Sequence, residues 1–147
     1  MLTHVVFGAG VVSALFASLP FDVRLPLAGA SSILVNFVVD AFGHTRHGGF
    51  VARSPLTHSV VTAPVWGGAL GYVLWAAGMN FGLVGASLEE VFLVGGVVAA
   101  LAHLFLDSMT EKGVYFITNR FALTHFGSGN SLLNAGFVAC GLALLLV

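Results

Sequence analysis

Five apolar segments run through this sequence, at residues 3–19, 26–43, 57–78, 88–109 and 131–147. Each approaches the length of about 20 residues that an α-helix needs to cross the hydrocarbon core of a bilayer. Polar stretches separate the segments, and only 7% of the residues are charged whereas 58% are hydrophobic. Soluble domains carry about 25% charged residues. The few charges of this chain would not cover a water-exposed surface. The pattern predicts an all-α, polytopic membrane helix bundle with about five transmembrane helices.

The length and the remaining composition restrict the classes of protein further. A chain of 147 residues is expected to form a single domain, residues 1–147. Its net charge of −1 argues against a nucleic-acid partner, because a phosphate backbone is bound by clustered lysine and arginine. The single cysteine, Cys140, excludes a disulfide framework and a cysteine-based zinc site. The N-terminal segment has no basic region before it, so we expect a membrane helix that is retained.

The basic residues predict an orientation in the membrane. With five spans, the N-terminus and the loops at 44–56 and 110–130 share one side. These loops carry most of the basic residues, namely Arg46, Arg53, Lys112 and Arg120. Because cytoplasmic loops are enriched in lysine and arginine, we expect an integral plasma-membrane protein with its N-terminus in the cytoplasm. Arg46 and Arg53 can equally be ordinary determinants of topology or parts of a functional site.

The histidines gather on the same predicted side. Five spans place every histidine of the chain near one membrane surface, together with two aspartates at the ends of the second and fourth segments. These residues are His4, Asp40, His44, His47, His58, His103, Asp107 and His125. Charge at membrane depth is costly, so an aspartate there is by default a functional hypothesis.

Two pairs in this group have the spacing of one helical turn. His103 and Asp107 read H-x-x-x-D, and Asp40 and His44 read D-x-x-x-H. Each pair presents an imidazole and a carboxylate on one helical face, which suits a metal ion. Neutral imidazole and carboxylate ligands favour zinc, with manganese and iron as alternatives, at a site on the cytoplasmic side. We therefore predict a divalent-metal site with the ligands His4, Asp40, His44, His58, His103 and Asp107.

Other interpretations remain open for the individual residues. A single histidine–aspartate pair can be a polar contact that locks two helices together. His58 follows Thr57, a candidate N-cap, and can simply begin the third helix. The sequence leaves open whether His47, Glu111 or His125 joins the site.

The order of these motifs resembles a known family. A histidine begins the first apolar segment, an aspartate ends the second, THS at 57–59 begins the third, and HLFLDSMTEKGV at 103–114 ends the fourth. This order resembles the YdjM-like membrane-bound metal-dependent hydrolases and a related archaeal family of membrane proteins of unassigned function. The YdjM-like family is distantly similar to zinc-dependent phospholipase C and the single-strand-specific nucleases, in which several helices hold up to three metal ions.

The resemblance implies a function as well as a site. It implies one to three metal ions and a hydrolase acting on a phosphoester, expected in a lipid or lipid-linked substrate at the cytoplasmic interface. With two ions, Asp40 or Asp107 is expected to bridge them, and Arg46, Arg53 and Lys112 are expected to contact phosphate oxygens. Two alternatives stay open. One is a transporter or channel for a metal ion or proton, and the other is a non-catalytic membrane protein whose metal only holds the helices together.

Overall fold

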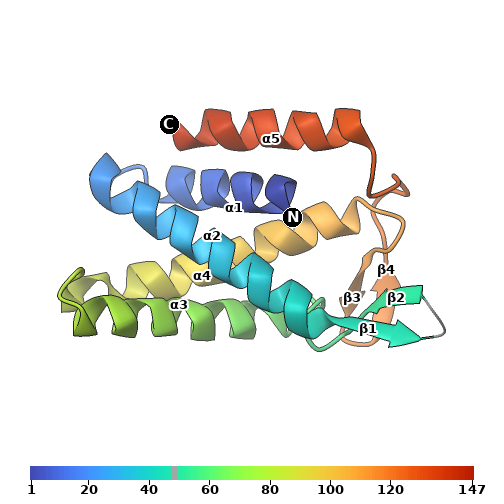
Figure 1. Cartoon of the computed structure of the whole chain (residues 1–147), viewed down its shortest axis with the longest axis horizontal. Coiled ribbons are helices and arrows are strands. Elements are labelled where there is room, and N and C mark those ends of the chain that lie inside the picture. The colour runs from blue at the N-terminus through green and yellow to red at the C-terminus, as the bar shows by residue number, and fades with distance from the viewer. Residues whose placement is uncertain (48–49) are drawn as a thin grey trace.

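The computed structural model describes residues 1–47 and 50–147. Within these residues the chain folds into a helical bundle with two small antiparallel strand pairs at one end (Figure 1). The elements are α1 (Leu2–Leu15), α2 (Phe21–Gly43), β1 (His44–His47), β2 (Phe50–Arg53), α3 (Ala63–Asn80), the 3₁₀ helix η1 (Ala86–Leu88), α4 (Glu89–Ser108), β3 (Val114–Phe116), β4 (Asn119–Phe121) and α5 (Ser131–Leu145). The predicted helical fold is confirmed, with one α-helix in each apolar segment.

Two helices begin at positions other than those predicted. Helix α2 begins at Phe21, so much of the supposed linker before residue 26 is helical. Helix α3 begins only at Ala63, with Pro64 in its first turn, where the missing N–H of proline costs nothing. The prediction that His58 begins the third helix is therefore wrong. His58 lies in the turn before α3 instead, and its carbonyl accepts a hydrogen bond from the Tyr115 N–H of β3 at 2.9 Å.

Close glycine contacts hold the helices together in pairs. Helices α3 and α4 touch where Gly67 faces Gly96, and a β-carbon on either glycine would collide with the backbone of the other helix. Helices α1 and α5 meet in the same way at Gly10 and Gly141. Small residues of this kind allow the close backbone approach that is common between helices in membranes.

The structure brings the polar elements to one end of the bundle. The strand pairs β1–β2 and β3–β4 lie beside the C-terminal ends of α2 and α4, and the C-terminus of the chain lies at the other end (Figure 1). Two stretches, Phe21–Gly43 and Ala86–Ser108, are long and apolar enough to cross a membrane. Helices α1 and α5, with 14 and 15 residues, are apolar but shorter.

The glycine contact between α1 and α5 gives a first prediction, with a matched control in the same helix. Gly141→Ala would place a β-carbon 2.6 Å from the Val6 carbonyl oxygen. A β-carbon on Gly136 would instead meet no neighbouring atom within 4 Å. We expect Gly141→Ala to lower the free energy of unfolding by about 1–3 kcal/mol through overpacking. Gly136→Ala should leave it unchanged or raise it by up to about 1 kcal/mol, since alanine favours helix. Denaturant unfolding in detergent measures both, and equal values would contradict the contact.

Candidate metal centre

The carboxylate of Asp107 lies at the centre of a buried polar cluster. Asp107 stands in the last turn of α4, and its side chain is only 2% exposed. Its Oδ1 atom accepts a hydrogen bond from the Arg53 guanidinium and lies 3.0 Å from Nε2 of His4. Its Oδ2 atom lies 3.4 Å from Nε2 of His58 and 3.2 Å from Nε2 of His103. Side chains from α1, β2, the turn before α3 and α4 therefore converge on one carboxylate.

Three of these atoms are buried without a hydrogen-bond partner among the described residues: His58 Nε2, His103 Nε2 and Asp107 Oδ2. Buried polar atoms are nearly always paired, so three adjacent exceptions require an explanation. The ligand atoms of these three residues lie within 4.8 Å of one another, close enough to hold one metal ion. A zinc ion with ligand distances of about 2.0–2.1 Å separates tetrahedral ligand atoms by about 3.3–3.4 Å. The observed separations of 3.2 and 3.4 Å from Asp107 Oδ2 fit that geometry.

The environment of His58 favours the neutral imidazole that binds metals. Its side chain is fully buried, and its Nδ1 atom lies 3.0 Å from the Thr57 hydroxyl. Burial lowers the pKa of His58, although the nearby Asp40 carboxylate acts in the opposite direction. The proton on Nδ1 can be donated to the Thr57 hydroxyl, which leaves the Nε2 lone pair directed toward Asp107.

A second, more open group shares His58. The ligand atoms of Asp40, His44 and His58 also lie within 4.8 Å of one another. Asp40 Oδ1 is 3.9 Å from His58 Nε2 and 3.6 Å from His103 Nε2, so it faces both groups. Asp40 and His44 are each about one-third exposed. The two groups thus form one continuous cluster, with a buried side at Asp107 and an accessible side at His44.

Arg53 connects this cluster to the loop after α4. One of its terminal nitrogens, Nη1, donates hydrogen bonds to the Asp107 and Gly113 carbonyls at 3.3 and 2.8 Å and to the Thr110 hydroxyl at 3.2 Å. Burial lowers the pKa of Arg53, with the Asp107 carboxylate opposing the change, and an arginine remains charged at neutral pH. Arg53 is expected from the sequence to contact substrate phosphate, but here its terminal nitrogens contact Asp107 and the loop.

The structure brings all the sequence-predicted metal ligands together: His4, Asp40, His44, His58, His103 and Asp107. Lys112 is half-buried and makes no side-chain hydrogen bond or ion pair within the described part of the chain. Arg46 and His47 lie in β1, but their side chains are outside the described part. Glu111 and His125 are exposed and belong to neither metal-ligand group.

Two residues of the cluster were not identified as site residues from the sequence. Asn36 contacts His103, with 2.7 Å between Asn36 Oδ1 and His103 Nδ1. Thr110 donates a hydrogen bond to the Asp107 carbonyl at 2.8 Å and accepts one from Arg53. The position of Asn36, one helical turn before Asp40, is the signal that could have placed it on the same face of α2.

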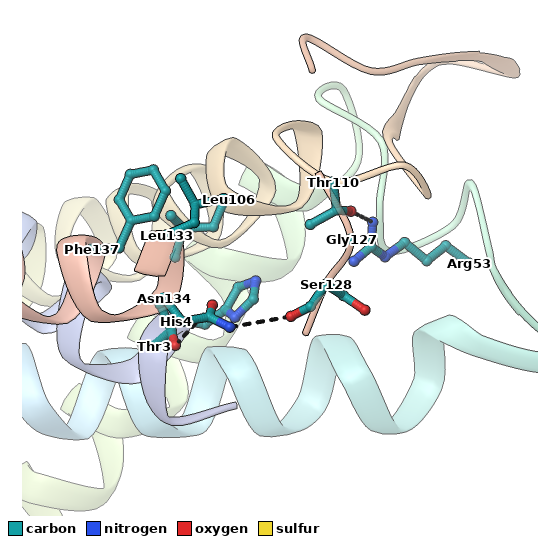
Figure 2. A pocket seen from close by; sticks show the side chains of 10 residues that line it. All are labelled: Thr3, His4, Arg53, Leu106, Thr110, Gly127, Ser128, Leu133, Asn134 and Phe137. Atoms are coloured by element: carbon teal, nitrogen blue, oxygen red, sulfur yellow. Dashed lines mark hydrogen bonds between the residues drawn. The ribbon is translucent and has the colours of Figure 1, made fainter. Parts of the chain in front are cut away.

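A cavity of about 50 Å³ lies beside the cluster (Figure 2). Its polar wall includes His4 and Arg53, the two side chains that hold Oδ1 of Asp107. Asn134 closes it from α5 by accepting a hydrogen bond from Thr3 and donating one to the Ser128 carbonyl (Figure 2). A cavity of this size, with polar side chains on one wall, has room for water next to the cluster. Its other lining residues are Leu106, Thr110, Gly127, Leu133 and Phe137.

Comparison with known proteins places the chain in a family. The family model described as "Protein of unknown function (DUF1286)" matches residues 1–106. The chain belongs to the DUF1286 family. No curated protein and no solved structure matches the chain. The part matched to DUF1286 runs from α1 to Leu106, two residues before the end of α4, and it contains every ligand candidate except Asp107.

The convergence of buried ligand atoms without a hydrogen-bond partner in the described part of the chain predicts bound metal in this DUF1286 protein. After mild purification in detergent, we expect near-stoichiometric zinc, manganese or iron by mass spectrometry. His58→Ala and His103→Ala should each remove most of it, because each deletes one buried ligand atom. His125→Ala is the control, since His125 is exposed and outside both groups. A metal-free native protein that also fails to take up added metal would contradict the site.

The buried charge pair predicts a large effect on stability. Arg53→Met would leave the Asp107 carboxylate buried without its cation. We expect a loss of about 3–5 kcal/mol in the free energy of unfolding of the metal-free protein, the range seen when one partner of a buried ion pair is removed. Arg120→Met, at an exposed arginine in β4, should change stability by less than about 0.5 kcal/mol. Similar unfolding midpoints for the two variants would show that Arg53 does not stabilise Asp107.

Proposed function

We propose that this DUF1286 protein is a membrane-embedded, metal-dependent hydrolase that acts on a phosphoester, in a lipid or lipid-linked substrate. The observation that carries the proposal is the convergence of three buried ligand atoms, from His58, His103 and Asp107, that have no hydrogen-bond partner among the described residues. The motif order that resembles the YdjM-like hydrolases supports the phosphoester as the substrate class. The accessible side of the cluster, at Asp40 and His44, gives a substrate a place to approach.

The donor set suits zinc, with manganese or iron as alternatives. His58, His103 and Asp107 would hold one ion. Because the group of Asp40, His44 and His58 uses the same Nε2 lone pair of His58, it would hold an ion in place of this one and not beside it. A bound zinc ion would supply Lewis-acid catalysis and lower the pKa of water at the site toward neutrality. His4 contacts the other oxygen of Asp107 and is the remaining candidate ligand.

The protein side chains then have separate tasks. The Asp40 carboxylate is partly exposed and faces both His58 and His103, so it is placed to accept the proton of an attacking water molecule. Arg53 holds the Asp107 carboxylate in place rather than binding substrate. Lys112, which makes no ion pair within the described part of the chain, is a candidate to contact the substrate phosphate, as the sequence predicts for it and for Arg46. The cavity beside His4 provides a place for water next to the cluster.

The apolar surface supports placement in a membrane. Large hydrophobic side chains are exposed along the helices, including Phe37 on α2, Val65 on α3 and Leu132 on α5. We propose that all five helices lie in the bilayer, with the metal site at the cytoplasmic surface. The basic residues of the loops beside the site favour the cytoplasmic side. At that depth the cluster lies level with lipid phosphate groups, which favours a lipid or lipid-linked substrate.

A transport function is the second candidate, and one observation favours it. Buried polar side chains continue from the cluster along the bundle, at Asn36, Ser32 and Ser31 of α2 and Ser13 of α1. The hydrogen bonds connect His103 to Asn36 and Asn36 to Ser32. Beyond these, the Ser31 and Ser13 hydroxyls have no hydrogen-bond partner among the described residues. The hydrogen-bonded path therefore ends within the bundle, which favours a reaction at the surface.

The hydrolase proposal predicts metal-dependent turnover. The zinc-loaded protein should hydrolyse bis(p-nitrophenyl) phosphate, or phospholipids in phosphatidylglycerol–phosphatidylcholine vesicles, and a chelator should abolish this until zinc returns. Asp40→Asn should lower kcat by about 10²–10⁴-fold, the usual contribution of a general base. Asp22→Asn, at the opposite end of α2, is the control and should leave kcat unchanged.

Two results would overturn this proposal. The first is a folded, metal-loaded protein that cleaves none of these phosphoesters but unfolds when the metal is removed. That result would support a metal that only holds the helices together. Uptake of metal ions or protons by proteoliposomes that collapses in the Asp40→Ala variant would support the transporter instead.

A further inference from the structure

Asn36 is a buried polar residue that contacts the group of candidate metal ligands without belonging to it. It lies on α2, one turn before Asp40, and is fully buried. Its Oδ1 atom is 2.7 Å from Nδ1 of His103, the ring nitrogen that does not face Asp107. Asn36 thus contacts a candidate ligand without being a candidate ligand itself.

The neighbours of Asn36 determine which way its amide points. The Nδ2 atom lies 2.7 Å from the backbone carbonyl of Ser32, which can only accept a hydrogen bond. The opposite orientation would place two acceptor oxygens in contact, so the amide nitrogen must face Ser32. The acceptor oxygen then faces His103, and Nδ1 of that ring must carry the proton. In the neutral imidazole, Nε2 is left with its lone pair toward Asp107.

Ser32 extends the same network to α1. Its hydroxyl donates a hydrogen bond to the Val5 carbonyl at 2.8 Å and accepts a hydrogen bond from Asn36 Nδ2 at 3.3 Å. Val5 follows His4 directly, and Gly8 leaves room on α1, because a β-carbon there would lie 2.6 Å from the Ser32 hydroxyl. One turn of α2 therefore contacts α4 at His103 and α1 next to His4.

We propose that Asn36 and Ser32 are positioning residues of the metal site: Asn36 selects the metal-binding tautomer of His103, and Ser32 fixes Asn36 and the His4 end of α1. Without the Asn36 acceptor, His103 is free to carry its proton on Nε2, where it blocks the lone pair that would bind the ion. The inference rests on the metal centre of the proposed function, but the tautomer of His103 can be measured without any metal.

The test compares variants of the full chain in detergent. Asn36→Leu should weaken zinc binding by about 10–100-fold, the usual effect of losing a residue that orients a ligand. Asn36→Asp keeps an oxygen that accepts the His103 proton, but its other oxygen replaces the donor to the Ser32 carbonyl, so it should bind zinc more tightly than Asn36→Leu and more weakly than the native protein. Ser32→Ala should weaken binding less than Asn36→Leu. Ser31→Ala is its control, because the Ser31 hydroxyl is equally buried but has no hydrogen-bond partner among the residues that the structure describes.

A spectroscopic measurement separates tautomer selection from a merely structural role. In the metal-free native protein, ¹⁵N NMR of the imidazoles should show His103 protonated on Nδ1, as in Asn36→Asp, and protonated at least partly on Nε2 in Asn36→Leu. A native His103 whose Nδ1 carries no proton overturns the proposal, even if Asn36→Leu fails to fold. Native-like zinc affinity in a folded Asn36→Leu variant also overturns it. A native protein that binds no zinc while His103 carries its proton on Nδ1 refutes the metal centre alone.

Discussion

The buried carboxylate of Asp107 is the group on which the polar end of this bundle depends. A charge removed from water is stable only when it is paired and hydrogen-bonded. The required partners come from distant parts of the chain: Arg53 from β2, His4 from α1 and His58 from the turn before α3. The strand pair β1–β2 and that turn are therefore more than connections, because they deliver the cation and one imidazole to the end of α4.

The two oxygens of Asp107 have different surroundings, and this difference gives the site its character. Oδ1 accepts the Arg53 hydrogen bond and contacts His4, so it anchors the carboxylate. Oδ2 faces the Nε2 atoms of His58 and His103 and has no hydrogen-bond donor among the described residues. One oxygen thus supports the fold and the other remains available as a ligand. The same separation explains why an arginine can lie beside a candidate metal site without occupying the position that a metal ion would take.

The sequence predicted the helices and the ligand candidates better than it predicted their supports. The spacing of His103 with Asp107, and of Asp40 with His44, is local and can be read directly from helical geometry. The contact between Asn36 and His103 joins two helices, so no periodicity reveals it. Arg53 illustrates a different limit. A guanidinium suits a carboxylate and a phosphate equally, and only the fold shows that Asp107 is its partner.

The division of the site among the helices suggests which parts of it can change independently. Asp40, Asn36, His103 and Asp107 lie on α2 and α4, the two long helices, which pack directly against each other. The wall of the cavity formed by Ser128 and Asn134 belongs to the segment outside the DUF1286 match, and α5 packs on α1 through Gly10 and Gly141. Substitutions on that segment can alter the cavity next to His4 without displacing the ligands on α2 and α4. The pairing of Asp107 with Arg53 then preserves the centre while its surroundings vary.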